Sequence, residues 1–242
     1  MGKYRRTQVD PYKQAERDKR DRAAAGYEEW YRRTKGARFD AYERRLFDEA
    51  IRSPTLRVLD LGSGTGRIAE TLARRTDVVA LDISISSLVL NRRANRIPVV
   101  AADSKDLPFA DSTFDAIVSC QVLQHLLPHD LDATLVACRR VLKRSGLLVF
   151  SVYNLHSLGN HGVRQRGGDS YGVRRWFSME DLRELAKRNG FRVDRITGYK
   201  ALPRRLEHVP GWDRADRWLA AAPVLGNHAS RYLLATFRRD GS

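Results

Sequence analysis

Cysteine is scarce in this sequence, and the scarcity narrows the classes of protein to which it can belong. The 242 residues hold two cysteines, Cys120 and Cys138, which lie 18 positions apart and form no C-x-x-C pair. We therefore predict neither a disulfide framework nor a zinc site. The six histidines show no metal-ligand spacing either, so we predict no metal site. Because so few thiols suit a reducing compartment, we expect a cytoplasmic protein.

Long apolar runs are missing as well. No stretch approaches the roughly 18 residues of a membrane-spanning helix, and the charged N-terminal region contains no apolar core of a signal peptide. We expect a soluble protein with no transmembrane segment. The length and the 42% hydrophobic content allow one sizeable core, which predicts a single domain with additions.

Acidic residues are too few to balance the basic ones. The chain has 29 Asp and Glu against 44 Lys and Arg, a net charge of +15. Residues 53–151 are nearly neutral, with 12 basic and 10 acidic side chains, whereas residues 1–52 have 15 against 10 and residues 152–242 have 17 against 9. The basic flanks either face an anionic substrate, a nucleic acid or a membrane surface, or form a solvated arginine-rich surface.

A glycine-rich turn follows the first apolar run. Residues 57–61 read as a strand, and Gly62, Gly64 and Gly66 alternate directly after it. Glycine permits a positive φ and removes the Cβ atoms that would keep a ligand off the peptide groups. The helix expected over residues 67–75 would point its N-terminal N–H groups at the turn, where a carboxylate or phosphate fits.

Polar residues follow the next three expected strands. The run 78–82 ends in Asp82, 20 positions beyond Gly62, where dinucleotide-binding folds place a carboxylate that accepts hydrogen bonds from ribose hydroxyls. The strand expected over 97–101 leads to Asp103 and Ser104, and the strand over 114–120 leads to Gln121. Open α/β sheets bind ligands at such strand ends, so the pattern predicts an adenosine-like ligand.

Together these segments resemble the class I S-adenosylmethionine-dependent methyltransferases, in particular the broad branch that acts mainly on small molecules and lipids. The resemblance implies an α/β fold: a Rossmann-like, doubly wound, seven-stranded sheet whose last strand is antiparallel, with N-terminal helices and lid insertions. Arg67 stands where a nicotinamide-binding turn would need another glycine. The matching segments are VLDLGSGTG (58–66), VVALD (78–82), AADSKDLPFADSTFDAIVSCQVLQHL (101–126) and RVLKRSGLLVFSVYN (140–154).

The resemblance also implies S-adenosylmethionine as the cofactor and assigns its contacts. The glycine turn would hold the methionine end, Asp82 the ribose hydroxyls, and Ile83 the adenine ring. Asp60 either accepts from the cofactor ammonium group or stabilises the turn through backbone N–H groups. The implied cofactor-binding residues are Asp60, Gly62, Ser63, Gly64, Gly66, Asp82, Ile83, Asp103, Ser104, Cys120 and Gln121.

His125 is the candidate general base, because it follows the fourth strand and its ordinary pKa suits neutral pH. The alternative is a histidine that only hydrogen-bonds its loop. Cys120 could act as a nucleophile, but its surroundings lack the Pro-Cys pair of pyrimidine methyltransferases, which favours a buried cysteine at a strand end.

The rest of the chain divides into flanking segments. Residues 1–25 are expected to form a basic, loose tail or a frayed helix. The single domain, 26–242, would comprise two helices (26–52), a cofactor-binding core (53–153) and two substrate-lid insertions (154–177 and 200–230). A helix is expected from Pro128, and a capping box is expected at 178–181. For the second insertion the alternative is a packing helix over 213–222.

These patterns lead to three functional hypotheses. The first is methyl transfer to a small-molecule or lipid-linked acceptor, which the basic flanks allow to be anionic, with peripheral membrane contact as an option. The second is a methyltransferase acting on tRNA, suggested by the same charge. The third is a catalytically inactive subunit that retains the cofactor site.

Overall fold

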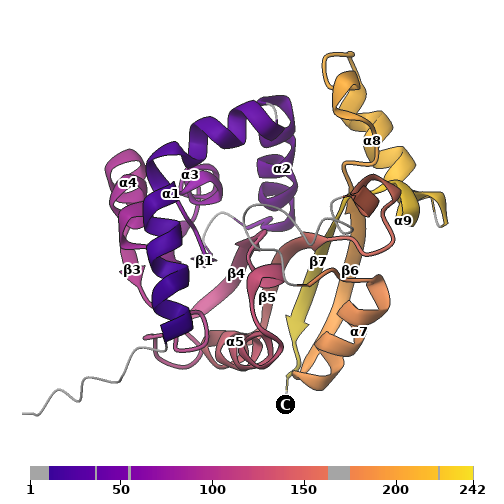
Figure 1. The fold of residues 1–242 in the computed structure, drawn as a ribbon. Coiled ribbons are helices and arrows are strands. Elements are labelled where there is room, and N and C mark those ends of the chain that lie inside the picture. The colour runs from indigo at the N-terminus through magenta and orange to yellow at the C-terminus, as the bar shows by residue number, and fades with distance from the viewer. Residues whose placement is uncertain (1–10, 36, 54–55, 163–174, 223, 242) are drawn as a thin grey trace, which may run out of the picture.

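The chain folds around one seven-stranded sheet, and the computed structural model describes residues 11–35, 37–53, 56–162, 175–222 and 224–241. The strand order is β3-β2-β1-β4-β5-β7-β6 (Figure 1). The strands are β1 (Arg57–Leu61), β2 (Asp77–Asp82), β3 (Val99–Ala101), β4 (Phe114–Cys120), β5 (Leu142–Tyr153), β6 (Phe191–Tyr199) and β7 (Tyr232–Arg239).

Strand direction confirms the predicted fold class. The first five strands pair in parallel, and β7 inserts antiparallel between β5 and β6. The strand β5 begins at Leu142, earlier than the expected Gly146, because Leu142 pairs with Phe114 ahead of a register shift. Because β1 to β6 all run in the same direction and only β7 is reversed, the carboxyl ends of β1 to β6 lie along one edge of the sheet.

Both faces of the sheet are covered, which explains why its strands are apolar without strict alternation. One apolar cluster joins Leu59, Phe150 and Phe237 to the helices α5 (Pro128–Val141) and α7 (Met179–Arg188). The other joins strand residues such as Val118 to Phe39 of α2 (Ala37–Ala50), and also contains side chains of α3 (Arg67–Leu72) and α8 (Trp212–Ala221).

Local signals place several helix ends where the sequence predicts them. Pro128 begins α5, and the expected capping box of α7 is present, with Ser178 and Asp181 bonding reciprocally. The φ of Gly190, +70°, ends that helix in the left-handed region that favours glycine. The helix α8 agrees with the packing-helix alternative for residues 213–222.

Of the two alternatives for residues 1–25, a loose tail or a frayed helix, the part that the structure describes agrees with a helix. Residues 11–25 belong to α1 (Pro11–Lys35), a helix of 25 residues, whereas residues 1–10 lie outside the described residues. Polar bonds attach α1 to the region where α4 (Ile85–Asn95) begins: Arg17 Nε donates to the carbonyl oxygen of Ile83 (3.1 Å), and Asp21 Oδ1 accepts from Ser84 Oγ (2.6 Å). Because charged side chains make this contact, apolar periodicity does not predict it.

None of the helices in the described ranges has both the length and the apolar character needed to cross a membrane.

Candidate functional site

A cavity lies at the sheet edge where β1, β2, β3 and β4 end, and side chains of α1 line its outer side. Parallel strands of open α/β sheets bind ligands at this edge. Most of the predicted site residues line the cavity: Asp60, Gly62, Ser63, Gly64, Asp82, Ile83, Asp103, Ser104, Cys120, Gln121 and His125. The structure therefore brings together strand ends that are up to 65 positions apart in the sequence.

The glycine turn leaves its backbone open toward the cavity. The φ angles of Gly62 and Gly64 are +72° and +53°, values that favour glycine. A Cβ on Gly62 would lie 2.4 Å from the Val122 side chain, so that position is closed by packing. A Cβ on Gly64 would meet no protein atom within 4 Å. The open space beside Gly64 lets a ligand lie directly against the main chain.

Gly66 does not share this role. It is absent from the cavity lining, and its φ of +93° marks the residue before α3. A Cβ there would lie 2.2 Å from Asn91 Oδ1, on α4. Gly66 therefore allows close packing of α3 on α4, and its position does not support the predicted cofactor contact.

Asp82 connects the second strand to the glycine turn. Its Oδ2 accepts from the backbone N–H of Gly64 and its Oδ1 from that of Ser84, both at 2.8 Å. Burial raises the pKa of Asp82, while these two backbone bonds oppose the shift. Each carboxylate oxygen keeps a further lone pair, which can accept from a ligand hydroxyl. The orientation of this carboxylate suits a ribose.

Asp60 lies on the cavity wall and also stabilises the turn. It is 1% exposed, and its Oδ2 accepts from the backbone N–H of Ala69 (3.0 Å). Burial raises the pKa of Asp60 to about 7. The turn-stabilising alternative is thus realised by one oxygen, and the carboxyl group still faces the cavity, where a ligand ammonium group would favour its ionised form.

Neighbouring groups fix the side chains at the end of the cavity where adenine is predicted to bind. Asp103 Oδ1 accepts from the backbone N–H of Lys105 (3.2 Å), and Ser104 Oγ lies 2.9 Å from Thr134 Oγ1. Together with Ile83 these residues give the cavity one apolar and two polar groups at the ends of β2 and β3. An adenine ring with its amino group matches this combination.

The sequence patterns described above do not predict the contribution of α1 to the site. One face of this helix lines the cavity with Tyr12, Lys13, Glu16, Arg20, Ala23, Ala24 and Tyr27. Lys13 Nζ lies 3.3 Å from Asp103 Oδ2 and 3.0 Å from Asp130 Oδ2, so α1 is paired to the predicted adenine end. The three- and four-residue spacing of these side chains is the signal that could have revealed a helix face.

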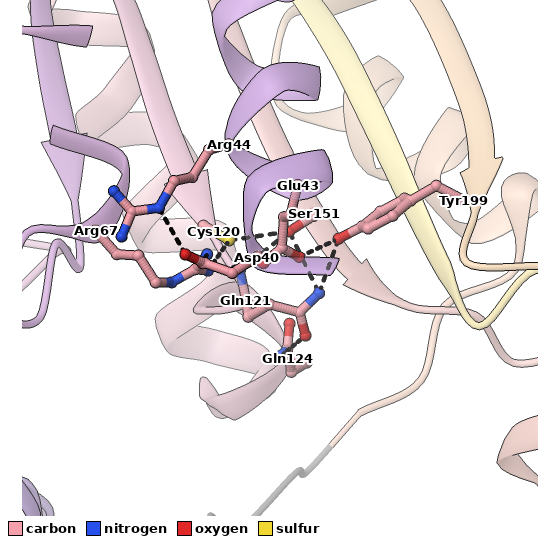
Figure 2. Close-up of polar contacts among 9 residues, drawn as sticks. All are labelled: Asp40, Glu43, Arg44, Arg67, Cys120, Gln121, Gln124, Ser151 and Tyr199. Atoms are coloured by element: carbon pink, nitrogen blue, oxygen red, sulfur yellow. Dashed lines mark hydrogen bonds and ion pairs between the residues drawn. The ribbon is translucent and has the colours of Figure 1, made fainter. Parts of the chain in front are cut away.

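A buried polar cluster lies beside the cavity and joins four elements (Figure 2). We call it the Glu43 cluster: Asp40, Glu43, Arg67, Gln121 and Tyr199. Arg67 pairs with Asp40 and, at 2.7 Å, with Glu43, while Tyr199 Oη donates to Glu43 (2.7 Å). Gln121 Nε2 donates to Tyr199 Oη (3.2 Å). Since Arg67 and Gln121 also line the cavity, the cluster connects the site to α2 and β6.

Cys120 contributes a neutral thiol to the same region. Its Sγ accepts from Arg67 Nη2 (3.3 Å), and burial raises the pKa of the thiol far above its ordinary value. A thiolate is the reactive form of cysteine, so these surroundings favour the buried-cysteine alternative over a nucleophile.

Gln121 and His125 follow β4 on a constrained segment. The φ of Gln121, +61°, places it in the left-handed region, which is uncommon for this residue type and occurs often at functional sites. His125 ends the 3₁₀ helix η1 (Leu123–His125) and lines the cavity, half-buried. A role for His125 as general base stays a prediction.

The two predicted lid insertions do not line this cavity with any of their described residues. Instead, Trp212 packs edge-on against Tyr42 of α2 at 5.2 Å, and Asp216 accepts from the backbone N–H groups of Lys200 and Leu202. The cover that the structure shows is α1. Residues 163–174, with most of the arginines of the first insertion, lie outside the described residues.

Metal ligation has no cluster to support it in the described parts of the chain, where no three His, Cys, Asp or Glu side chains gather closely enough to hold an ion.

Comparisons with known proteins agree with this site. Residues 59–150 match a family described as a methyltransferase domain. A demethylmenaquinone methyltransferase from Renibacterium salmoninarum is 31% identical over 180 residues, 73% of this chain and 70% of that protein. Another, from Thermobifida fusca, is 38% identical over 136 residues, and the match spans about half of each chain, 53% and 52%.

The fold has a solved counterpart with low sequence identity. A crystal structure of an S-adenosylmethionine-dependent methyltransferase from Thermotoga maritima aligns with a TM-score of 0.70 at 19% identity, covering 93% of this chain and all of that one. The likeness concerns the sheet and its flanking helices. Taken with the relatives and with the strand-end cavity, it leads to one conclusion: the chain belongs to the class I S-adenosylmethionine-dependent methyltransferases.

Proposed function

We propose that the protein transfers the methyl group of S-adenosylmethionine to a small-molecule or lipid-linked acceptor. The observation that carries the proposal is the cavity under α1, in which the open backbone at Gly64 and the carboxylates of Asp82 and Asp103 face one space. These groups match the amino acid end, the ribose and the adenine of the cofactor.

The residues present fit the cofactor. Asp60 and the turn at Gly64 would hold its ammonium and carboxylate groups, and Asp82 would hold its ribose. When bound, the cofactor supplies a methyl group attached to a sulfonium sulfur. This sulfur is an excellent leaving group because it departs as a neutral thioether. The protein therefore has to position the acceptor in line and exclude water, and the cover provided by α1 suits both tasks.

An acceptor that must lose a proton would need a base near the transferred group. His125 is the candidate, because it lines the cavity at the end of β4. The relatives named demethylmenaquinone methyltransferases support a quinone-like, lipid-linked acceptor as the first class to test. A recessed cavity at the strand ends favours such a molecule over a folded RNA.

The test is incubation with methyl-labelled S-adenosylmethionine and cell extract, followed by separation into lipid, small-molecule, protein and RNA fractions. Label in the lipid or small-molecule fraction is expected, and a demethylated quinol is the first purified acceptor to try. Label in RNA would favour the tRNA alternative. Cofactor binding without labelling of any fraction would favour an inactive subunit.

A further inference from the structure

Large apolar side chains are exposed together at one end of the molecule. Leu158, Trp218, Val224 and Leu225 are 75%, 78%, 73% and 61% exposed, and we call them the α8–α9 patch. They lie on η2 (Leu158–Asn160), on α8, and on or directly before α9 (Leu225–Ala229). The helix α9 contacts both η2 and α8, so these side chains belong to adjoining elements. Large apolar side chains exposed on adjoining elements indicate an interaction surface.

The patch continues along one face of α8. Arg214, Trp218 and Ala221 are exposed and recur at helical spacing, whereas Trp212 and Asp216 are buried on the opposite face. Trp218 therefore points away from the core as a consequence of the helix register. Its neighbours along the chain, Val224 and Leu225, extend the same apolar surface.

The exposed charged side chains of residues 200–231 are mostly arginines. Arg205, Arg214 and Arg231 are exposed. The acidic residues of residues 200–231 turn inward or are paired: Glu207 and Asp216 are buried, and Asp213 pairs with Arg45 at 2.5 Å. The exposed charged side chains of this segment are thus cationic, and the segment also carries the apolar patch. This combination complements the apolar interior and anionic headgroups of a lipid bilayer.

The patch is connected to the sheet edge that carries the cavity. The strand β6 ends at Tyr199 and β7 begins at Tyr232, which pairs with both Tyr199 and Tyr153. The segment between them, including α8 and α9, therefore projects from the carboxyl edge of the sheet (Figure 1, upper right). A membrane bound by the patch would lie toward the edge of the sheet that carries the cavity.

We propose that the α8–α9 patch binds the surface of an anionic membrane, with Trp218, Val224 and Leu225 inserted among the headgroups and the arginines against phosphate. Tryptophan suits this interface because its ring is apolar and its indole N–H can stay hydrated. A symmetric contact between two copies of the patch would bring like charges together, which disfavours self-association there.

Vesicle binding tests the proposal on the full chain. Sedimentation with phosphatidylcholine vesicles that contain phosphatidylglycerol should recover the protein, and purely phosphatidylcholine vesicles should recover much less. Brominated lipid should quench tryptophan fluorescence in the wild type, and the quenching should be lost in Trp218→Phe. Binding requires no methyl acceptor, so the result is independent of methyl transfer.

Two double variants separate the contribution of the apolar side chains to membrane binding from that of the arginines. The double variant Trp218→Ser, Leu225→Ser should lower the partition coefficient by about tenfold or more, and Arg205→Gln, Arg214→Gln should do so only on anionic vesicles. Val136→Ser on α5 and Arg144→Gln on β5 are matched controls, because they are exposed on other elements and should leave binding unchanged. Thermal unfolding checks that all variants fold.

The proposal is overturned if the wild type does not sediment with anionic vesicles, or if the patch variants bind as well as the controls. It is also overturned if the same substitutions abolish dimerisation or RNA binding and leave vesicle binding intact.

Discussion

At the scale of single residues, Asp60 and Asp82 share the cavity wall but have different partners. Asp60 has one backbone donor, the Ala69 N–H, whereas Asp82 has a donor on each oxygen. Each backbone bond favours the ionised carboxylate and offsets part of the burial that raises the pKa. Asp60 is therefore the carboxyl group whose protonation near neutral pH should affect cofactor binding.

The affinity for S-adenosylmethionine should rise from pH 5.5 to pH 7. The pKa of Asp60 is about 7, and an ammonium group binds only its ionised form, so a proton must leave before binding at lower pH. The loss below the pKa should approach about tenfold per pH unit. Calorimetry at several pH values measures this slope, and Asp60→Asn should make it shallower. An equal slope in that variant would contradict the assignment.

The backbone at Gln121 makes a second prediction. Because its φ is +61°, Gln121→Gly relieves strain that Gln121→Ala retains, while both variants lose the side-chain bond to Tyr199. The glycine variant should be more stable than the alanine variant by about 0.5–1 kcal/mol. Urea denaturation measures the difference, and a more stable alanine variant would show that the left-handed conformation carries no strain.

At the scale of elements, α1 is held over the cavity by charged contacts. Lys13→Ala removes the cation between Asp103 and Asp130. Amide hydrogen exchange in residues 11–25 should then accelerate by about fivefold or more, with little change in global unfolding. Lys19→Ala is the matched control on the same helix, since Lys19 does not line the cavity. Equal exchange in the two variants would mean that Lys13 does not fasten α1.

The Glu43 cluster fastens α2 to the site in the same way. Arg67→Met leaves the carboxylates of Asp40 and Glu43 without their shared cation, and Glu43 is 1% exposed. The free energy of unfolding should fall by about 3 kcal/mol. Arg74→Met removes an exposed pair, 3.8 Å from Glu70, and should cost less than about 1 kcal/mol. Similar losses of stability in both variants would show that the Glu43 cluster contributes no more to the free energy of unfolding than an exposed ion pair.

At the scale of the whole molecule, the sequence predicts the sheet and the strand ends that form the cavity. The strands that carry Asp60, Asp82 and Gln121 are short apolar runs with turn residues after them, and their signals are local. The same holds for the capping box at Ser178. Local patterns are enough to predict these strand ends, because parallel strands bring their carboxyl ends to one edge of the sheet whatever segments connect them.

The cover of the site could not be predicted in this way. The helix α1 has little apolar character, and its position depends on long-range pairs such as Lys13 with Asp130, far apart in the sequence. The Glu43 cluster likewise joins residues as distant as Glu43 and Tyr199. Gly66 shows the opposite case: a motif assigns it to the ligand, whereas the structure shows it packed against Asn91 and away from the cavity lining.

Calorimetric titration with S-adenosylhomocysteine, the demethylated product of the cofactor, tests the cofactor site most directly. The wild type should bind one molecule per chain, and Asp82→Ala should bind more than about tenfold more weakly. Asp77→Ala, at the other end of β2, is the matched control and should bind like the wild type. No binding by the wild type, or equal affinity in the Asp82 and Asp77 variants, would contradict a cofactor site at these strand ends.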